Sequence, residues 1–257
     1  MPKSDALDPD KIKANLNTKR IGRKILVYSS TSSTNDIAAE YARNKKNDGL
    51  AIFAEEQAAG RGRTGAKWLS GQADSILCSI VLTKGKLNPE LLSLACAVAV
   101  ADAIGKPAKI KWPNDIILNG KKVAGILLES KTNSNATVYI IGIGINCHQQ
   151  VFADELKQTA TSLDIESRTV CDRISLAKRL LSSTDHWLET AEKNGQKVVD
   201  QWRKLSVQLG HRVTLVYNRK KFAGNCIGID PQKGLILQLD SGGVRMFHAA
   251  HTAVTKQ

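Results

Sequence analysis

The sequence contains few cysteines and no paired cysteine motif. Its five cysteines are odd in number and scattered, and none forms a Cys-x-x-Cys pair; they are Cys78, Cys96, Cys147, Cys171 and Cys226. This pattern argues against a structural zinc site and against a dithiol redox centre. Such cysteine usage is typical of proteins in a reducing compartment, and we therefore expect a cytoplasmic location.

Long hydrophobic runs are also missing. The longest apolar stretch, residues 91–104, is interrupted by Ser93 and Asp102 and is shorter than the roughly 20 residues that cross a bilayer. It therefore predicts a buried helix. Residues 1–16 contain no apolar segment of the signal-peptide kind, so neither a signal peptide nor a membrane anchor is expected.

Acidic residues are outnumbered by basic ones. The chain of 257 residues has 37 Lys and Arg against 24 Asp and Glu, a formal net charge of +13. The excess favours polyanionic partners such as nucleic acids, nucleotides or acidic proteins, without choosing among them. A basic nucleic-acid-binding module is one alternative, but only four Phe and four Tyr are present, and no helix-turn-helix pattern or basic-aromatic interleaving supports it.

Hydrophobic periodicity predicts an α+β domain over residues 24–207, preceded by a polar leader, residues 1–23. Strand-like patterns cover residues 24–28, 50–55, 75–82, 116–118, 123–129 and 137–145, with turns at Asn119-Gly120 and at residues 133–135. Helical patterns cover residues 33–44, 88–104, 172–193 and 198–205. We therefore expect a mixed, mostly antiparallel sheet covered by helices.

The pattern changes after Gly210. Short alternating segments at residues 213–217, 222–229, 235–239 and 244–247 are separated by turn residues. This spacing is typical of a small β-domain. We expect a C-terminal β-barrel over residues 208–257.

The densest candidate site is the hexapeptide Gly60-Arg61-Gly62-Arg63-Thr64-Gly65. It matches the G-x-G-x-x-G dinucleotide fingerprint, but residues 66–71 do not continue as the helix that the fingerprint requires, and we therefore discount nicotinamide or flavin binding. Exposed amides and two guanidinium groups suit a flexible cover over phosphate or carboxylate oxygens. Taken alone, the segment could equally be a basic surface loop.

A second candidate is the pentapeptide Lys111-Trp112-Pro113-Asn114-Asp115, where a strand ends in a turn. Asn114 and Asp115 can ligate Mg²⁺, and Lys111 can neutralise phosphate charge. An ordinary Asn-Asp turn with a core tryptophan is the structural alternative.

Two glycine-containing strand segments follow. Residues 121–127 begin with lysines and include Gly125, and residues 142–146 include Gly142, Gly144 and Asn146. Glycine lets a ligand approach the backbone of a strand, although it more often marks a bulge. Asn146 at a strand end could hydrogen-bond a base or an amide.

Taken in order, these segments resemble the catalytic domain of biotin protein ligases, and the resemblance covers roughly residues 24–257. It rests on the glycine-arginine loop followed by Trp68, the pentapeptide, residues 122–127 and 142–146, and Ser33-Thr34-Asn35. The resemblance implies a class II synthetase-like domain of the biotin-lipoate ligase type, followed by an SH3-like β-barrel. It also implies an ATP-dependent ligase that activates biotin as biotinyl-5'-AMP, with Mg²⁺, and transfers it to a lysine of a biotin carboxyl carrier protein domain, such as that of acetyl-CoA carboxylase.

The same resemblance assigns roles to individual residues. The biotin-binding residues would be Ser33, Thr34, Gln57, Arg61, Arg63, Lys122 and Gly125. The ATP-binding residues would be Gly60, Gly62, Gly65, Trp68, Asn114 and Asn146. The catalytic residues would be Arg63, Lys111, Asp115 and Lys122, with Asn114 and Asp115 holding Mg²⁺ and Asp115 helping the target amine to lose its proton.

Some features depart from the family pattern. Thr64 and Ala66 stand where the family usually has basic residues, which predicts weaker retention of the adenylate, and residues 245–257 resemble the family little. Only some 23 residues precede the catalytic core, so a DNA-binding repressor domain is not expected. The nearest rival is a lipoate or octanoate ligase or transferase, which uses the same acyl chemistry. A homodimer, through strand pairing at residues 137–145, is a further expectation.

Overall fold

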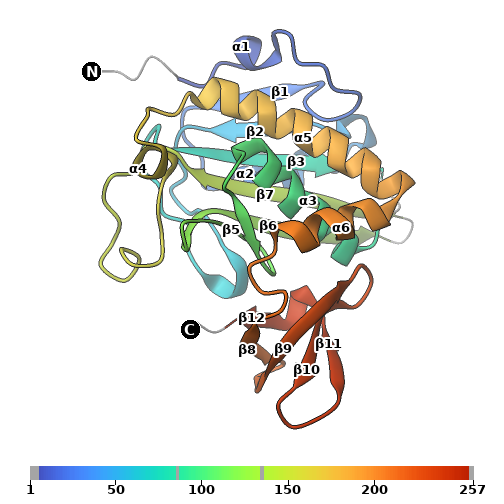
Figure 1. Cartoon of the computed structure of the whole chain (residues 1–257). Helices are drawn as coiled ribbons and strands as arrows, with labels where there is room; N and C mark the ends of the chain where they lie inside the picture. The colour runs from blue at the N-terminus through green and yellow to red at the C-terminus, as the bar shows by residue number, and fades with distance from the viewer. Residues whose placement is uncertain (1–5, 85–86, 134–135, 255–257) are drawn as a thin grey trace.

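The computed structural model describes residues 6–84, 87–133 and 136–254. Its larger part is built on a seven-stranded sheet in the order β1-β2-β3-β7-β6-β5-β4 (Figure 1). The strands are β1 (Ile25–Tyr28), β2 (Ala51–Ala54), β3 (Ser75–Leu82), β4 (Lys109–Lys111), β5 (Asp115–Leu118), β6 (Lys121–Asn133) and β7 (Ala136–Asn146). Only β1 and β2 pair in parallel among these described strands. The predicted mixed, mostly antiparallel sheet with helices is therefore confirmed.

The two faces of the sheet are covered differently because side chains alternate along a strand. Ile52, Val81 and Ile140 pack beneath α2 (Thr34–Tyr41) on one face. Their neighbours Ile80 and Ile141 point to the other face and join the main core. That core is covered by α1 (Pro9–Lys13), α3 (Pro89–Ile104), α5 (Arg173–Lys193) and α6 (Gly195–Leu205). The face beneath α2 is thus the one left partly open.

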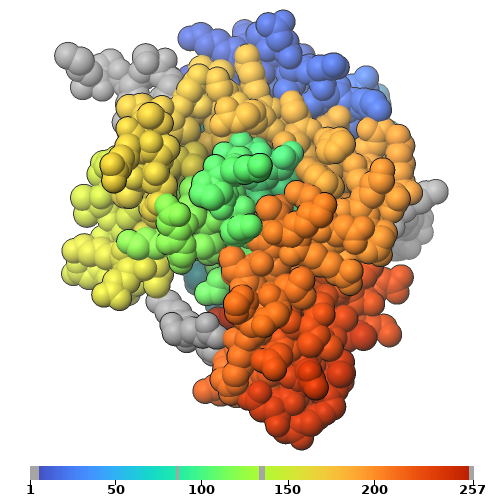
Figure 2. Space-filling model, in the orientation of Figure 1, coloured from blue at the N-terminus to red at the C-terminus, as the bar shows by residue number. Residues whose placement is uncertain are grey.

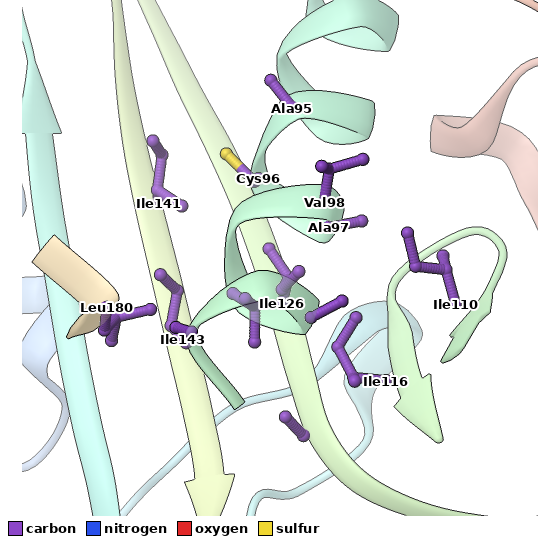
Figure 3. Packing of buried hydrophobic residues seen from close by; sticks show 14 of the residues in the cluster. Ala95, Cys96, Ala97, Val98, Ile110, Ile116, Ile126, Ile141, Ile143 and Leu180 are labelled. Atoms are coloured by element: carbon purple, nitrogen blue, oxygen red, sulfur yellow. The ribbon is translucent and has the colours of Figure 1, made fainter. Parts of the chain in front are cut away.

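Helix α3 is the centre of the main core and confirms the predicted buried helix. The Asn88 side chain accepts a hydrogen bond from Leu91 N at 2.9 Å and caps the helix, and Pro89 occupies its first turn. Apolar side chains surround α3 because the sheet lies on one side and α5 and α6 on the other; Figure 3 shows Cys96 and Val98 among isoleucines of the sheet. Across the described segments, no helix combines the length and the apolar character needed to cross a membrane.

The C-terminal residues form a separate five-stranded antiparallel sheet in the order β11-β10-β9-β8-β12. Its strands are β8 (Arg212–Tyr217), β9 (Lys220–Asp230), β10 (Gly234–Leu239), β11 (Val244–Phe247) and β12 (Thr252–Val254). It projects from one end of the larger sheet as the red lobe in Figures 1 and 2. Periodicity predicted the first four strands; β12 has only three residues and is defined by its pairing with β8.

The N-terminal segment is more than the polar leader expected from its composition. Leu7, Ile12 and Ile21 are buried in the main core. The Asp185 carboxylate on α5 accepts hydrogen bonds from the backbone N–H groups of Lys19, Arg20 and Ile21 at 2.7, 2.9 and 2.8 Å. Three isolated apolar residues among charged ones give no periodic signal, and their partners are distant in sequence. Residues 6–23 therefore pack onto the α5 side of the domain.

The expected strand pairing at residues 137–145 is wrong. Strand β7 lies between β3 and β6, and its backbone pairs with both of them. A central strand has no free edge for a second subunit or a carrier peptide. The expected turn at residues 133–135 lies partly outside the described residues. The predicted helix over residues 33–44 ends at Tyr41 and is followed by a short 3₁₀ turn, Lys45–Asn47.

Candidate active site

A cavity of about 640 Å³ opens on the face of the sheet that carries α2. Its walls come from five parts of the chain: the first turn of α2, residues 57–68, residues 111–115, residues 156–159 and β12. The floor is formed by β3, β6 and β7. All predicted site residues line this cavity except Gly60, Gly65 and Asn146.

The floor is flat because of an alternation of isoleucine and glycine along β7. Ile141, Ile143 and Ile145 belong to the main core, so Gly142 and Gly144 face the cavity. The Trp68 indole lies against this floor: a Cβ added at Gly144 would come within 2.5 Å of two of its ring carbons. Gly144 therefore permits a close approach that no larger residue would allow, and a Cβ added at Gly125 on β6 would likewise come within 3.0 Å of the Trp68 ring.

A polar pocket occupies the α2 end of the cavity. Gln57 Oε1 accepts a hydrogen bond from Thr34 N at 2.7 Å and lies 3.0 Å from Thr34 Oγ1. Thr34 Oγ1 is in turn 2.7 Å from Ser79 Oγ on β3, and Ser33 and Thr34 are almost fully buried. The structure thus brings together Ser33, Thr34 and Gln57, three of the residues predicted to bind biotin, with hydroxyl and amide groups suited to a small polar heterocycle.

The opposite end of the cavity is charged. Lys122 Nζ, at the start of β6, lies 2.6 Å from Asp115 Oδ1 on β5 and 5.7 Å from the centre of the Trp68 ring. Lys111 at the end of β4 lines the same wall. Because β4, β5 and β6 are adjacent antiparallel strands, two lysines and one carboxylate meet at one edge of the sheet.

Arg63 links this charged end to the C-terminal lobe. Its Nη1 donates to Asn114 Oδ1 at 3.2 Å, and its Nη2 donates to the carbonyls of Ala249 and Thr252, the latter at 2.9 Å. Burial lowers the pKa of the Arg63 guanidinium, while Asp115 and Glu90 raise it. The predicted catalytic Arg63 is therefore in the cavity, but in this structure its donors are engaged with neutral acceptors.

Arg61 is bound differently. Its guanidinium makes a bidentate pair with the Asp36 carboxylate at 2.9 and 2.7 Å. Hydrogen bonding to Arg61 holds the pKa of Asp36 below its usual value, and the same contact raises the pKa of Arg61. Arg61 lines the cavity with its charge already compensated.

Several lining residues were not identified from the sequence. The C-terminal Thr252, Ala253 and Val254 close one side of the cavity. Residues 156–159 form another wall, which is attached to β6 because Lys122 N donates to Thr159 O at 2.8 Å. Neither segment carries a motif, and both reach the site only through long-range packing. Asn35, by contrast, had a signal, since it adjoins the predicted Ser33-Thr34 pair.

Three predicted residues are not part of the cavity lining. The Asn146 side chain is buried and donates from Nδ2 to Thr161 O at 2.9 Å, which fixes the base of the wall at residues 156–159. Gly60 packs against the Trp68 backbone and the Gln57 side chain. Gly65 has open space around it and a positive φ of 82°. For Asn146 the strand-end position suggested a ligand contact, but the side chain turns into the protein.

No cluster of three or more His, Cys, Asp or Glu side chains able to hold a metal occurs in the described part of the chain. The cavity does contain the Asp115 carboxylate and the Asn114 amide oxygen. Hard oxygen ligands of this kind suit Mg²⁺, which is often bound through one or two carboxylates together with substrate phosphates.

The comparisons with known proteins agree with this architecture. Residues 27–146 match the model of the biotin/lipoate A/B protein ligase family. The biotin--[acetyl-CoA-carboxylase] ligase of Mycobacterium tuberculosis is 31% identical, with 95% of both chains covered, and the bifunctional ligase/repressor BirA of Bacillus subtilis is 31% identical over 96% of this chain and 79% of its own. The biotin protein ligase of Aquifex aeolicus, solved in complex with biotin and ATP, superposes with a TM-score of 0.80 at 26% identity and covers 91% of this chain and 100% of that one. The chain belongs to the biotin protein ligases.

Proposed function

We propose that this protein activates biotin with ATP and transfers it to a lysine of a biotin carboxyl carrier domain. The observation that carries the proposal is one cavity with two chemically different ends. Thr34 and Gln57 provide hydrogen-bonding groups at one end, and Lys111, Lys122 and Arg63 provide cations at the other. A ligand with a polar ring and a carboxylate tail would place its carboxylate among these cations, beside the phosphates of a nucleotide.

The first step would join two anions. The biotin carboxylate would attack the α-phosphorus of ATP, and the bond to the diphosphate leaving group would break. Lys111 and Lys122 line the cavity and would face the negative charge that develops, and fixed donors at such a position stabilise a transition state strongly. Asp115 orients Lys122 through their 2.6 Å ion pair. The chemistry needs charge neutralisation and alignment more than an acid-base pair.

Asn114 and Asp115 are the residues that would hold Mg²⁺. The ion, when bound, would neutralise charge on the nucleotide phosphates. Its donors fit a site completed by substrate oxygens rather than a closed protein cage.

The second step would use the amine of the target lysine. The amine would attack the acyl carbon of biotinyl-5'-AMP, an amide would form, and AMP would leave with the phosphate oxygen. Asp115 is the one carboxylate lining the cavity among the described residues, and this supports assigning to it the acceptance of the proton that the amine loses. The loop of residues 60–68 lies over the cavity and would keep water from the reactive intermediate until then.

The proposal extends to the partner and the domains. The names of the Mycobacterium tuberculosis and Paracoccus denitrificans relatives specify acetyl-CoA carboxylase, which supports a carboxylase carrier domain as the acceptor. We assign catalysis to residues 24–207 and a supporting wall of the site to residues 208–257. Five free cysteines support a reducing cytoplasm. A homodimer remains a prediction, and β7 cannot form its interface because both edges of this strand are already paired.

The test is exchange of labelled diphosphate into ATP, which reports the first step without an acceptor protein. We expect exchange with biotin and Mg²⁺, and none without biotin. Exchange that requires lipoate or octanoate instead of biotin would show that the protein is a lipoate or octanoate ligase. No exchange with any of these acids, at concentrations that saturate a control ligase, would refute the proposal.

A further inference from the structure

The loop of residues 60–68 is attached to the rest of the protein at three places. Arg63 holds it to the C-terminal lobe, and Trp68 rests on the glycine floor. The third attachment is the ion pair between Arg61 and Asp36 on α2. The loop itself is a narrow hairpin, in which Gly62 N donates to Ala66 O at 2.6 Å and the backbones of Arg61 and Lys67 form an antiparallel β-bridge. Such a hairpin can open as a unit only if all three attachments release.

The attachment at α2 involves two carboxylates for one guanidinium. Arg61 Nη2 lies 2.7 Å from Asp36 Oδ1 and 3.6 Å from Glu129 Oε1. Glu129 is fixed in turn, because Asn35 Nδ2 donates to its Oε2 at 2.8 Å. With two anions around it, Arg61 has no net charge to offer a bound carboxylate or phosphate. Its geometry favours a role other than the direct ligand contact expected from the sequence.

Asp36 is well placed to act as a fixed anchor. It lies in the first turn of α2, where the positive end of the helix dipole favours a carboxylate. The two residues before it, Thr34 and Asn35, line the polar pocket. The ion pair therefore joins the loop of residues 60–68 to the first turn of α2, which lines the polar pocket.

We propose that Arg61 and Asp36, supported by Glu129, form a clamp that keeps the loop closed over the acyl adenylate. This inference rests on the proposed function and adds a positioning role for residues that do not take part in the chemistry. When the loop opens, water can attack the acyl carbon of biotinyl-5'-AMP; the acyl–oxygen bond to the phosphate breaks, the biotin carboxylate and AMP leave, and the two protons of the water pass to solvent or to the AMP phosphate. The clamp sets how often this loss occurs before an acceptor lysine arrives.

The clamp is built to be reversible. The Arg61 and Asp36 side chains are 41% and 44% exposed, and ion pairs with this exposure contribute little to folding stability. Their loss should therefore change loop opening without unfolding the domain. A second Arg-Asp pair, Arg212 with Asp240 in the C-terminal lobe, has a carboxylate of similar exposure, 46%, and Asp240 does not line the cavity, so Asp240 provides a matched comparison for Asp36.

The experiment uses the full chain with biotin and MgATP and no acceptor. It compares the rate of AMP release with the rate of diphosphate exchange in the wild type and in Asp36→Asn and Asp240→Asn. We expect the ratio of AMP release to exchange to rise about 2- to 5-fold in Asp36→Asn, as the loss of an exposed ion pair allows, and to stay at the wild-type value in Asp240→Asn. Asp36→Glu, which keeps the charge, should recover part of the difference.

Arg61→Lys is a second, independent test because it keeps the charge but loses the bidentate geometry. It should raise the same ratio, with a melting temperature close to that of the wild type. An unchanged ratio in both Asp36→Asn and Arg61→Lys, with normal exchange, would overturn the clamp and leave the proposed function intact. Absence of exchange in the wild type would instead refute the proposed function on which the clamp depends.

Discussion

Lys122→Ala should reduce adenylation strongly with little effect on folding. Lys122 Nζ lies 2.6 Å from Asp115 Oδ1, and the two side chains are 34% and 27% exposed. Loss of one well-placed donor to a developing anion lowers a rate by about 10²- to 10³-fold. The Asp115 carboxylate then loses its cation and repels the negative charge that develops in the reaction. Two such unit charges about 4 Å apart in a partly solvated site repel by up to about 4 kcal/mol. We therefore expect at least the upper end of this range.

The same change should affect stability far less. An ion pair with this exposure contributes at most about 1 kcal/mol to folding. The assay is biotin-dependent diphosphate exchange at saturating biotin and ATP, together with urea unfolding. Lys121→Ala is the matched control, because Lys121 precedes Lys122 on β6 and does not line the cavity. Exchange by Lys122→Ala within about threefold of the wild type would refute the electrostatic role assigned to Lys122.

Three further predictions concern residues around the site. Gly144→Ala places a Cβ 2.5 Å from the Trp68 ring and should displace it, so that the KM for biotin in the exchange assay rises roughly tenfold; an unchanged KM would contradict the flat-floor argument. Gln208→Ala removes both hydrogen bonds to the Trp112 peptide, at 2.6 and 3.1 Å, and should lower the free energy of unfolding by about 1–3 kcal/mol in urea titrations; a smaller loss would mean that water replaces the amide. Burial raises the pKa of Glu90, so the folded state favours the neutral form, and ionisation of this carboxyl lowers the free energy of unfolding as pH rises through the folded pKa. Glu90→Gln should therefore stabilise the protein at pH 7.5 and not at pH 4. An equal change in the free energy of unfolding at both pH values would contradict this prediction.

Local patterns predicted much of the site because its elements are short-range. The alternation of Ile141, Gly142, Ile143 and Gly144 places isoleucines in the core and glycines in the cavity, and period-2 geometry alone dictates this. The Asn119-Gly120 turn likewise brings β5 and β6 together. Charged residues at the ends of adjacent strands then meet without any long-range information.

The missing parts depend on contacts between distant segments. Arg63 is bound by the carbonyls of Ala249 and Thr252, and backbone acceptors leave no trace in side-chain pattern. The Arg61–Asp36 pair joins a predicted ligand-binding arginine to an aspartate 25 residues away that carries no motif of its own. Asn146 shows the reverse case: its side chain donates to the Thr161 carbonyl, and a polar residue at a strand end can serve the protein's own backbone as readily as a ligand.

The most direct test of the account is transfer itself. The purified protein would be incubated with biotin, MgATP and a carboxylase carrier domain, and the carrier would be analysed by intact mass and peptide mass spectrometry. The account predicts the addition of one biotinyl group to a single lysine of the carrier, lost when biotin or ATP is omitted or when that lysine is replaced by arginine. A carrier that remains unmodified, or that gains a lipoyl or octanoyl group from a mixture of acids, would contradict the account.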